Sequence, residues 1–213
     1  MLQLAGIDTT ADSLMFLIWI LSLPKNEQYQ DRLREEVLSV QAGPSGLPAL
    51  KAISQLPWLN AVIKEALRLF TPLPSFEPRL SRTDCIIDGY AIPAGTVVGM
   101  SPYCMHRNAD IFAQPHVFKP ERWMDDNGNL LPESAPQNKW FWAFSSGARM
   151  CIGLHLAHAE MLMLVATVYQ RFVTVARWPE ISPAITSRYE IFYDETFDKV
   201  KEHECFVDFR ART

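Results

Sequence analysis

The chain has 213 residues, which suits one domain with a sizeable hydrophobic core. Hydrophobic residues make up 48% and charged residues 21% of the sequence, as in an ordinary globular domain. The formal net charge is -4, so the chain lacks the basic balance that binding to nucleic acid requires. We therefore expect no nucleic-acid partner.

The four cysteines show neither a C-x-x-C pair nor the density of a secreted disulfide scaffold. We expect reduced thiols at Cys85, Cys104, Cys151 and Cys205. Three of them are expected to be small core residues, and Cys151 differs because of the sequence around it.

The longest unbroken apolar run, Leu14 to Leu21, is too short to span a bilayer, which needs roughly 20 residues. It also differs from a signal peptide, because Asp8 and Asp12 precede it and no Lys or Arg occurs before Lys25. The chain itself is therefore expected to carry neither a membrane anchor nor an export signal.

The first predicted element is a mostly apolar, buried helix over residues 1–23, which ends at a proline. It has no capping residue at its start, so we expect the chain to begin inside a longer helix. Asn26 is suited to cap a second helix that runs to about Val40. Pro57 opens a third helix, whose buried face reaches Phe70.

Short strands are predicted after the third helix. Residues 85–87 and 90–92 flank Asp88-Gly89, a dipeptide typical of tight β-hairpins. A further strand is expected at residues 96–100, so this part of the chain should form a small sheet.

The rest of the chain is predicted to be mainly helical again. Residues 103–142 should form loops and short helices, and a last long helix covers residues 152–172. Weak alternation predicts a C-terminal hairpin from residues 189–193 and 204–209. The expected fold class is therefore mainly α with small β-sheets.

The segment 144–153 brings a cysteine to the start of the last helix through a glycine-containing loop. A thiolate at Cys151 is favoured there, because it faces the positive end of the helix dipole and the free amides of the residues that follow. Arg149 adds a cation that can pair with an anionic ligand group. Gly147 and Gly153 let the backbone approach something large and flat.

Two other interpretations of this cysteine stay open at this point. A cysteine at a helix start is most often a buried free thiol. Cys151, His155 and His158 would also share one helix face, and zinc accepts these ligands, although the sequence shows no fourth ligand.

The same segment resembles the heme-binding signature of the cytochrome P-450 superfamily. Every fixed position of that signature is filled, by Phe144, Gly147, Arg149, Cys151 and Gly153. The resemblance implies that Cys151 is the axial thiolate ligand of the iron in heme b, a ligand that favours cleavage of the O–O bond. It further implies that Phe144 shields the sulfur and that Arg149 pairs with a heme propionate.

A second motif, Ala5-Gly6-Ile7-Asp8-Thr9-Thr10, lies in the first helix. By itself it indicates a local kink, in which Thr9 bonds to the carbonyl four residues back. In the family this pattern lies across the heme from the cysteine, and Gly6 would open a groove for O2. The resemblance makes Thr9 and Asp8 catalytic: Thr9 would hydrogen-bond the dioxygen and Asp8 would feed protons inward.

Glu65 and Arg68 lie three residues apart on the third helix, away from its apolar face. Spacing alone favours an exposed ion pair worth about 0.2–0.5 kcal/mol. In the family, Glu-x-x-Arg is a buried pair joined by an Arg from a Pro-Glu-Arg segment, here Arg122 of Pro120-Glu121-Arg122-Trp123. The resemblance therefore implies a structural network of Glu65, Arg68 and Arg122 that supports the heme loop.

The stretch between these motifs also matches the family. Arg79 occupies the position of a propionate-binding arginine, although Arg82 lies close by. Residues 88–96 resemble the strand and turn that precede the family's His-Arg segment, here His106-Arg107-Asn108. Those three residues are expected to order the loop rather than to bind a metal.

The motifs occur in the family's order, from the first residues to near the end of the chain. They imply one partial domain over residues 1–213, from the dioxygen helix through the cysteine loop to the C-terminal hairpin. This is the C-terminal, heme-binding part of the cytochrome P-450 fold. Complete members are usually more than twice as long, so we expect truncation at the N-terminus. The Pro-Glu-Arg-Trp and Phe-Ser-Ser-Gly segments are most similar to those of fungal members.

The resemblance implies a heme-thiolate monooxygenase, which inserts one atom of O2 into a small organic substrate and reduces the other to water. Electrons would come from NADPH through a reductase partner. A full-length member would lie at the endoplasmic reticulum membrane, and a fungal one would serve secondary metabolism. Two alternatives stay open: a non-catalytic fragment that binds heme weakly or not at all, and a heme-thiolate isomerase or dehydratase. Intact Asp8 and Thr9 favour oxygen chemistry over the isomerase or dehydratase.

Overall fold

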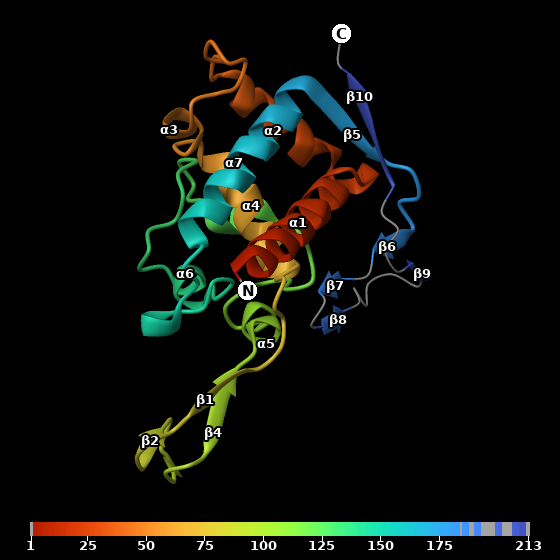
Figure 1. The fold of residues 1–213 in the computed structure, drawn as a ribbon. Coiled ribbons are helices and arrows are strands. Elements are labelled where there is room, and N and C mark those ends of the chain that lie inside the picture. The colour runs from red at the N-terminus through yellow and green to blue at the C-terminus, as the bar shows by residue number, and fades with distance from the viewer. Residues whose placement is uncertain (1, 184, 188–189, 193–198, 202–205, 212–213) are drawn as a thin grey trace.

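Four long helices dominate the computed structural model, which describes residues 2–183, 185–187, 190–192, 199–201 and 206–211 (Figure 1). They are α1 (Leu2–Leu21), α2 (Glu27–Leu38), α4 (Pro57–Leu69) and α7 (Leu154–Arg171). All four were predicted, with slightly different ends, and residue 1 of the first lies outside the described residues. The connections contain α3 (Leu50–Ile53), α5 (Pro102–His106), α6 (Pro136–Trp140) and the 3₁₀ turns η1 (Pro24–Asn26), η2 (Pro120–Trp123) and η3 (Gly147–Arg149).

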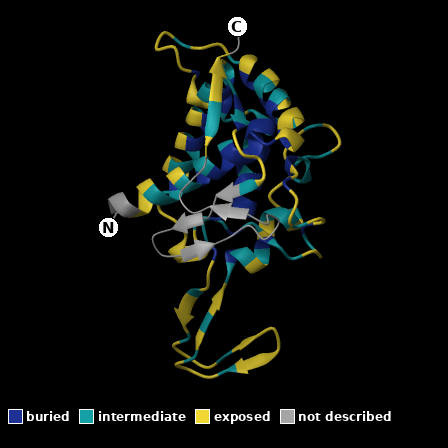
Figure 2. Ribbon diagram, turned by 90° about the vertical axis from the view of Figure 1, so that its right-hand side faces the viewer, coloured by how far each residue is buried: buried dark blue, intermediate teal, exposed yellow. Residues whose placement is uncertain are grey.

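The core lies where the four long helices meet (Figure 2). Phe16 of α1 stacks on Phe70, with ring centroids 4.8 Å apart. Leu33 of α2, Val62 of α4 and Val165 of α7 are fully buried in the same cluster. Since each such side chain contributes about 1.5–3 kcal/mol when buried, apolar packing holds this frame together.

Two side chains of the α1–α2 region act at helix ends. Asn26 makes no capping hydrogen bond to α2, contrary to the prediction; its buried Nδ2 donates to the Ile20 carbonyl at 2.7 Å and joins the end of α1 to the start of α2. The carboxylate of Glu36 in α2 accepts the amides of Trp58 and Leu59 at 2.8 and 2.7 Å. Helix α4 is therefore capped by another helix, with a favourable negative charge at its N-terminus.

A small arm projects from the helices (Figure 1). Strands β2 (Cys85–Ile87) and β3 (Tyr90–Ile92) form the predicted hairpin. Asp88 and Gly89 both have positive φ angles, 50° and 81°, as a tight hairpin turn requires. The strand predicted at 96–100 is β4 (Val97–Met100), and it pairs with β1 (Glu77–Leu80), which the sequence did not predict.

The C-terminal strands differ from the predicted hairpin. Strand β10 (Val207–Ala211) pairs with β5 (Phe172–Ala176), directly after α7, and β8 (Glu190–Phe192) pairs with β7 (Ile185–Ser187). Strand β6 (Ile181–Pro183) runs parallel to β9 (Lys199–Lys201). The prediction that the segments near 190 and 207 pair with each other is therefore wrong, and its residues 189, 193, 204 and 205 lie outside the described residues.

Within the described part of the chain, no single helix has both the length and the apolar character needed to cross a membrane. One bent pair meets that requirement by length and composition alone: residues 5–21 of α1 together with residues 24–38, which meet at 86°. Much of the second half of α1 is buried in the core.

A buried glutamine joins α2 to the end of α1 and to β5. Gln30 Nε2 donates to the carbonyls of Leu21 and Thr174 at 2.9 and 3.0 Å, and its Oε1 accepts the Thr174 amide at 2.9 Å. The side-chain amide thus pairs with Thr174 as a neighbouring strand would. Gln30 is only 3% exposed, so water cannot replace these bonds.

We expect Gln30→Met to lower the free energy of unfolding by about 2–4 kcal/mol, because it leaves the buried amide and carbonyl of Thr174 without partners. Urea denaturation measures this loss. The control Gln28→Met replaces an exposed glutamine of the same helix and should change stability by less than about 0.5 kcal/mol. Equal effects of the two variants would contradict the assignment.

Candidate active site

Cys151 lies in an exposed loop between η3 and α7. Its amide donates to the Phe144 carbonyl at 2.9 Å, which closes the base of the loop. Helix α7 begins at Leu154, later than the predicted residue 152, and the Leu154 amide donates to the Cys151 carbonyl at 3.4 Å. One of the amides expected to face the sulfur is therefore used by the backbone.

Backbone geometry explains part of the loop sequence. Gly147 and Ser145 have left-handed φ angles of 69° and 60°. A Cβ at Gly147 would meet no atom within 4 Å, so the turn rather than packing requires glycine there. A Cβ at Gly153 would lie 3.8 Å from the Cys151 Sγ, an ordinary van der Waals distance, so this glycine borders the sulfur.

Large apolar side chains are exposed around Cys151. Ile152 is 91% exposed, Leu156 65% and Met150 47%. Arg149 is exposed too, and among the described residues its guanidinium has no hydrogen bond or ion pair. An apolar surface with a free cation fits a large apolar ligand that carries anionic groups.

The other predicted catalytic motif lies in the first half of α1. Thr9 Oγ1 donates to the Ala5 carbonyl at 2.5 Å, which is the local bond expected without the resemblance. A Cβ at Gly6 would meet no atom within 4 Å, so contacts within the described chain do not require glycine there. Burial and the charge of Asp8 raise the pKa of Asp12 to about 6. This part of α1 therefore carries a carboxyl group that exchanges a proton near neutral pH.

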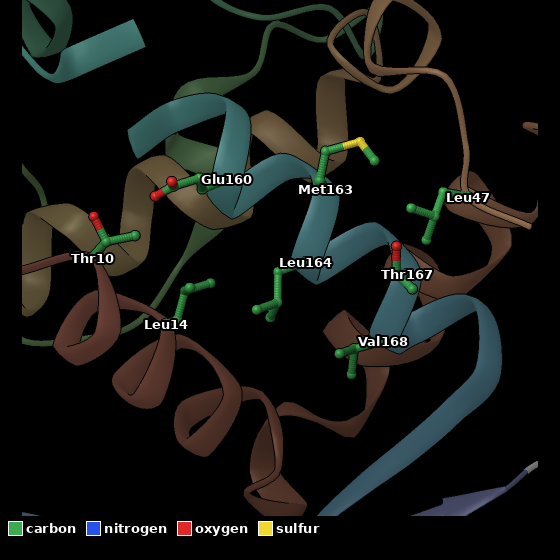
Figure 3. Close-up of a pocket in the computed structure, with 8 residues that line it drawn as sticks. All are labelled: Thr10, Leu14, Leu47, Glu160, Met163, Leu164, Thr167 and Val168. Carbon is green, nitrogen blue, oxygen red and sulfur yellow. The ribbon is translucent and has the colours of Figure 1, made fainter. Parts of the chain in front are cut away.

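An open groove of about 490 Å³ runs between α1 and α7. Figure 3 shows Thr10 and Leu14 of α1, and Glu160 and Leu164 of α7, with their side chains at this groove. Its walls are almost entirely apolar. Thr10 directly follows Thr9, so the groove begins beside the α1 motif, but its described lining includes none of the predicted site residues.

A buried carboxylate organises the predicted structural network. Glu65 of α4 is 0% exposed. It accepts two hydrogen bonds from Arg68, both at 2.9 Å, and one from Arg122 Nε at 3.1 Å. The Trp123 indole and the Lys119 amide each donate to it at 2.9 Å. The structure brings Glu65, Arg68 and Arg122 together, and the exposed ion-pair interpretation is wrong.

The remaining N–H groups of the two arginines bind the segment between α5 and η2. Arg68 Nη1 donates to the carbonyls of His106 and Pro115, at 2.7 Å each. Arg68 and Arg122 both reach the Val117 carbonyl at 3.3 Å. Helical periodicity places Glu65 and Arg68 outside the apolar face of α4. Both are buried because the segment between α5 and η2 covers that side of the helix.

Arg79 lies on β1, in the projecting arm. Its guanidinium pairs with Glu77 at 3.2 Å and donates to the Pro78 carbonyl at 3.0 Å, and its side chain is 44% exposed. Within the described residues these polar contacts stay on its own strand, and none joins Arg79 to the cysteine loop.

No group of three or more His, Cys, Asp or Glu side chains suited to a metal ion occurs among the described residues. The zinc interpretation of Cys151 therefore has no support.

Cys85, Cys104 and Cys151 are free thiols, as predicted, and Cys205 lies outside the described residues. Cys104 is exposed, so its expected place in the core is wrong.

Two contributors to this region were not identified from the sequence. Trp123 donates to Glu65, and its place next to Arg122 in Pro-Glu-Arg-Trp was the available signal. Lys64 Nζ donates to Asn138 Oδ1 at 2.5 Å and lies 5.0 and 5.2 Å from the ring centroids of Trp123 and Phe141. Burial lowers the pKa of Lys64. No sequence pattern connects Lys64 with these distant partners.

The cytochrome P450 family matches residues 1–177 of this chain. Similar relatives include the cytochrome P450 monooxygenase macH of Penicillium terrestre, 39% identical over 171 residues, which cover 79% of this chain and 32% of the relative. Mitochondrial cytochrome P450 11B1 of Sus scrofa is 38% identical over 174 residues, covering 81% and 32%. Cytochrome P450 2U1 of Homo sapiens is 31% identical over 188 residues, covering 88% and 33%.

The chain belongs to the cytochrome P450 family. It spans about a third of the length of the curated relatives it matches. The family implies a heme cofactor and oxidoreductase chemistry, and the relative from Penicillium terrestre is named a monooxygenase. Because fungal and animal relatives are similarly close, a fungal origin stays a prediction.

We expect Glu65→Gln to destabilise the chain by about 3–5 kcal/mol, because the neutral side chain leaves two buried arginines without their counter-charge and its NH2 group would face N–H donors at either oxygen position. Thermal and urea unfolding measure the loss. The control Glu35→Gln changes an exposed carboxylate on α2 and should have little effect. A wild-type melting temperature for Glu65→Gln would show that the network does not hold the fold.

Proposed function

We propose that this chain is the heme-binding part of a heme-thiolate monooxygenase. The complete enzyme would insert one atom of O2 into a small organic substrate and reduce the other to water, with electrons from NADPH through a reductase. The observation that carries the proposal is the exposed Cys151 loop ahead of α7, with an exposed Arg149 and exposed apolar side chains beside it.

The chemistry of the loop residues fits heme b. Cys151 would supply the thiolate, Arg149 would pair with a propionate, and the half-buried Phe144 would shield the sulfur. Gly147 and Gly153 would leave room for the flat ring, since neither position has a crowding side chain. Heme bound there supplies the redox chemistry that activates O2.

Arg79 would be a second partner for a propionate. It would exchange its 3.2 Å bond to Glu77 for the propionate. Surface ion pairs are worth only about 0–1 kcal/mol, so this exchange costs little.

On α1, Asp8 and Thr9 would handle protons. Thr9 Oγ1 directs its own proton to the Ala5 carbonyl, which leaves its lone pairs able to accept a hydrogen bond. Asp8 precedes it in the same turn and would pass protons from solvent. Gly6 would leave space for O2 beside the helix, in keeping with the open Cβ position there.

The second candidate is a fragment without catalysis of its own. It is favoured by the open apolar groove between α1 and α7, where Leu164 is 40% exposed. The additional length of the relatives would complete the site. No observation favours an isomerase or dehydratase. A place at the endoplasmic reticulum membrane and in fungal secondary metabolism are further proposals that follow from the likeness to longer members.

We expect Cys151→Ser to abolish thiolate-type heme ligation, because a serine hydroxyl does not replace a thiolate at iron. The chain is titrated with hemin, reduced and exposed to carbon monoxide, and its absorption spectrum is recorded. The control Cys104→Ser removes another exposed thiol, on α5, and should keep the wild-type spectrum.

Retention of the thiolate-type spectrum by Cys151→Ser would eliminate Cys151 as the ligand. Failure of the wild-type chain itself to bind hemin would instead support the fragment without catalysis.

In a complete enzyme that carries this helix, we expect Thr9→Ala to keep heme binding but to uncouple NADPH use from product formation, with release of peroxide. The variant removes the hydroxyl that would control proton delivery. NADPH consumed, product formed and peroxide released are measured together. Unchanged coupling would leave Thr9 with only its local bond to Ala5. The 213-residue chain alone should show no substrate turnover in the same assay.

A further inference from the structure

His106, at the end of α5, bonds to the backbone of two distant segments. It is 0% exposed. Its Nδ1 lies 3.1 Å from the Arg68 carbonyl in α4, and its Nε2 lies 2.8 Å from the Trp142 amide, two residues before the segment 144–153 that carries Cys151. Within the described residues, one imidazole thus joins the charged network to the segment that leads to Cys151.

The partners of His106 fix its protonation state. A carbonyl can only accept, so Nδ1 must carry the hydrogen; a backbone amide can only donate, so Nε2 must present its lone pair. Burial and the charges of Arg68 and Arg107 lower the pKa of His106 to about 3, in agreement with this neutral tautomer. Near neutral pH the ring is therefore a fixed donor on one side and a fixed acceptor on the other.

The ring itself is held in place from several directions. Arg68 Nη1 donates to the His106 carbonyl at 2.7 Å, so the two residues bond reciprocally. The ring stacks on Phe141, with centroids 5.5 Å apart and an interplanar angle of 13°. Phe112 lies against its edge at 6.4 Å. These contacts hold the His106 side chain rigidly, so it can fix the position of the groups to which it bonds.

Trp142 connects His106 to the cysteine loop through hydrogen bonds. Its carbonyl accepts the Ser145 amide at 3.0 Å, and its indole donates to Ser146 Oγ at 2.8 Å. The Phe144 carbonyl then accepts the Cys151 amide at 2.9 Å. These hydrogen bonds join Trp142 to the residues before Cys151 and Phe144 to Cys151 itself. A shift of Trp142 therefore moves the base of the loop that carries the sulfur.

We propose that His106 is a positioning residue for the thiolate: its bond to the Trp142 amide sets the place of Cys151 relative to α4. The inference rests on the proposed function, because the thiolate matters only if it binds a ligand. The rival is that His106 merely fills the core and ties α5 to α4, with no specific effect on the loop.

Three variants separate these possibilities. The Gln side-chain amide reaches the place of Nε2, so His106→Gln can still accept the Trp142 N–H. The Asn amide reaches only the place of Nδ1, so His106→Asn keeps only the bond to the Arg68 carbonyl. His106→Phe keeps the stacking on Phe141 and loses both bonds. His116→Gln, at an exposed histidine, is the matched control.

Two readouts are compared on the 213-residue chain. Hydrogen exchange of the Trp142 and Cys151 amides, without heme, should accelerate roughly tenfold in His106→Asn and His106→Phe and remain near wild type in His106→Gln. The carbon monoxide spectrum after hemin loading should shift from the thiolate-bound to the thiol-bound form in the same two variants only. The His116→Gln variant should match wild type in both readouts.

Equal behaviour of the Gln and Asn variants in hydrogen exchange would overturn the inference, since both keep one bond but only one keeps the bond to the loop. Should His106→Phe fail to fold, the comparison of Gln with Asn still decides. A wild-type chain that binds no hemin would defeat the proposed function, whereas the exchange result would still judge whether His106 holds the loop.

Discussion

The buried carboxylate of Glu65 is the constraint on which the described site depends. Burying a charge costs several kcal/mol unless counter-charges and hydrogen bonds replace its hydration. Here Arg68, Arg122, an indole and a backbone amide supply that environment. Three of these donors, Lys119, Arg122 and Trp123, follow Glu65 by 54, 57 and 58 residues, so the carboxylate is satisfied only when η2 and the segment before it fold over α4. We therefore expect the network to be a condition for folding here, which the apolar core alone would not specify.

The long helices could be predicted because their apolar positions recur with the helical period and their boundaries carry clear signals, as at Pro57. The C-terminal pairing could not. Alternation in a short strand shows which face is buried, but it does not identify the partner. Strand β10 pairs with β5, whose Thr174 is fixed by Gln30 from 144 residues away. The cap predicted at Asn26 failed for a similar reason, because a buried carbonyl at Ile20 was the better partner.

The residues of the candidate site also fall into two groups, those that the sequence predicts and those that it does not. The glycines, arginine and cysteine of the cysteine loop lie within ten residues, so a local pattern identifies them. Helical spacing placed Glu65 on an exposed face, and only the resemblance to a family placed it in a buried network. His106 has backbone partners 38 and 36 residues away, and no spacing rule connects them. The residues of the cysteine loop can be recognised in the sequence because they are neighbours along the chain. The residues that hold this loop in place are brought together only by tertiary folding.

The conformation of Thr9 limits how α1 can take part in oxygen chemistry. A hydroxyl has one hydrogen, and here it is directed to the Ala5 carbonyl. While this bond is kept, Thr9 can accept a hydrogen bond but does not donate one to a ligand. The hydroxyl turns freely about its Cβ–Oγ bond. In the proposed enzyme, donation to dioxygen would therefore require the bond to Ala5 to break, and a ligand could drive this by offering a better acceptor than a carbonyl already bonded within the helix. Proton delivery would then be coupled to the presence of the ligand, which is the property that a relay on α1 needs.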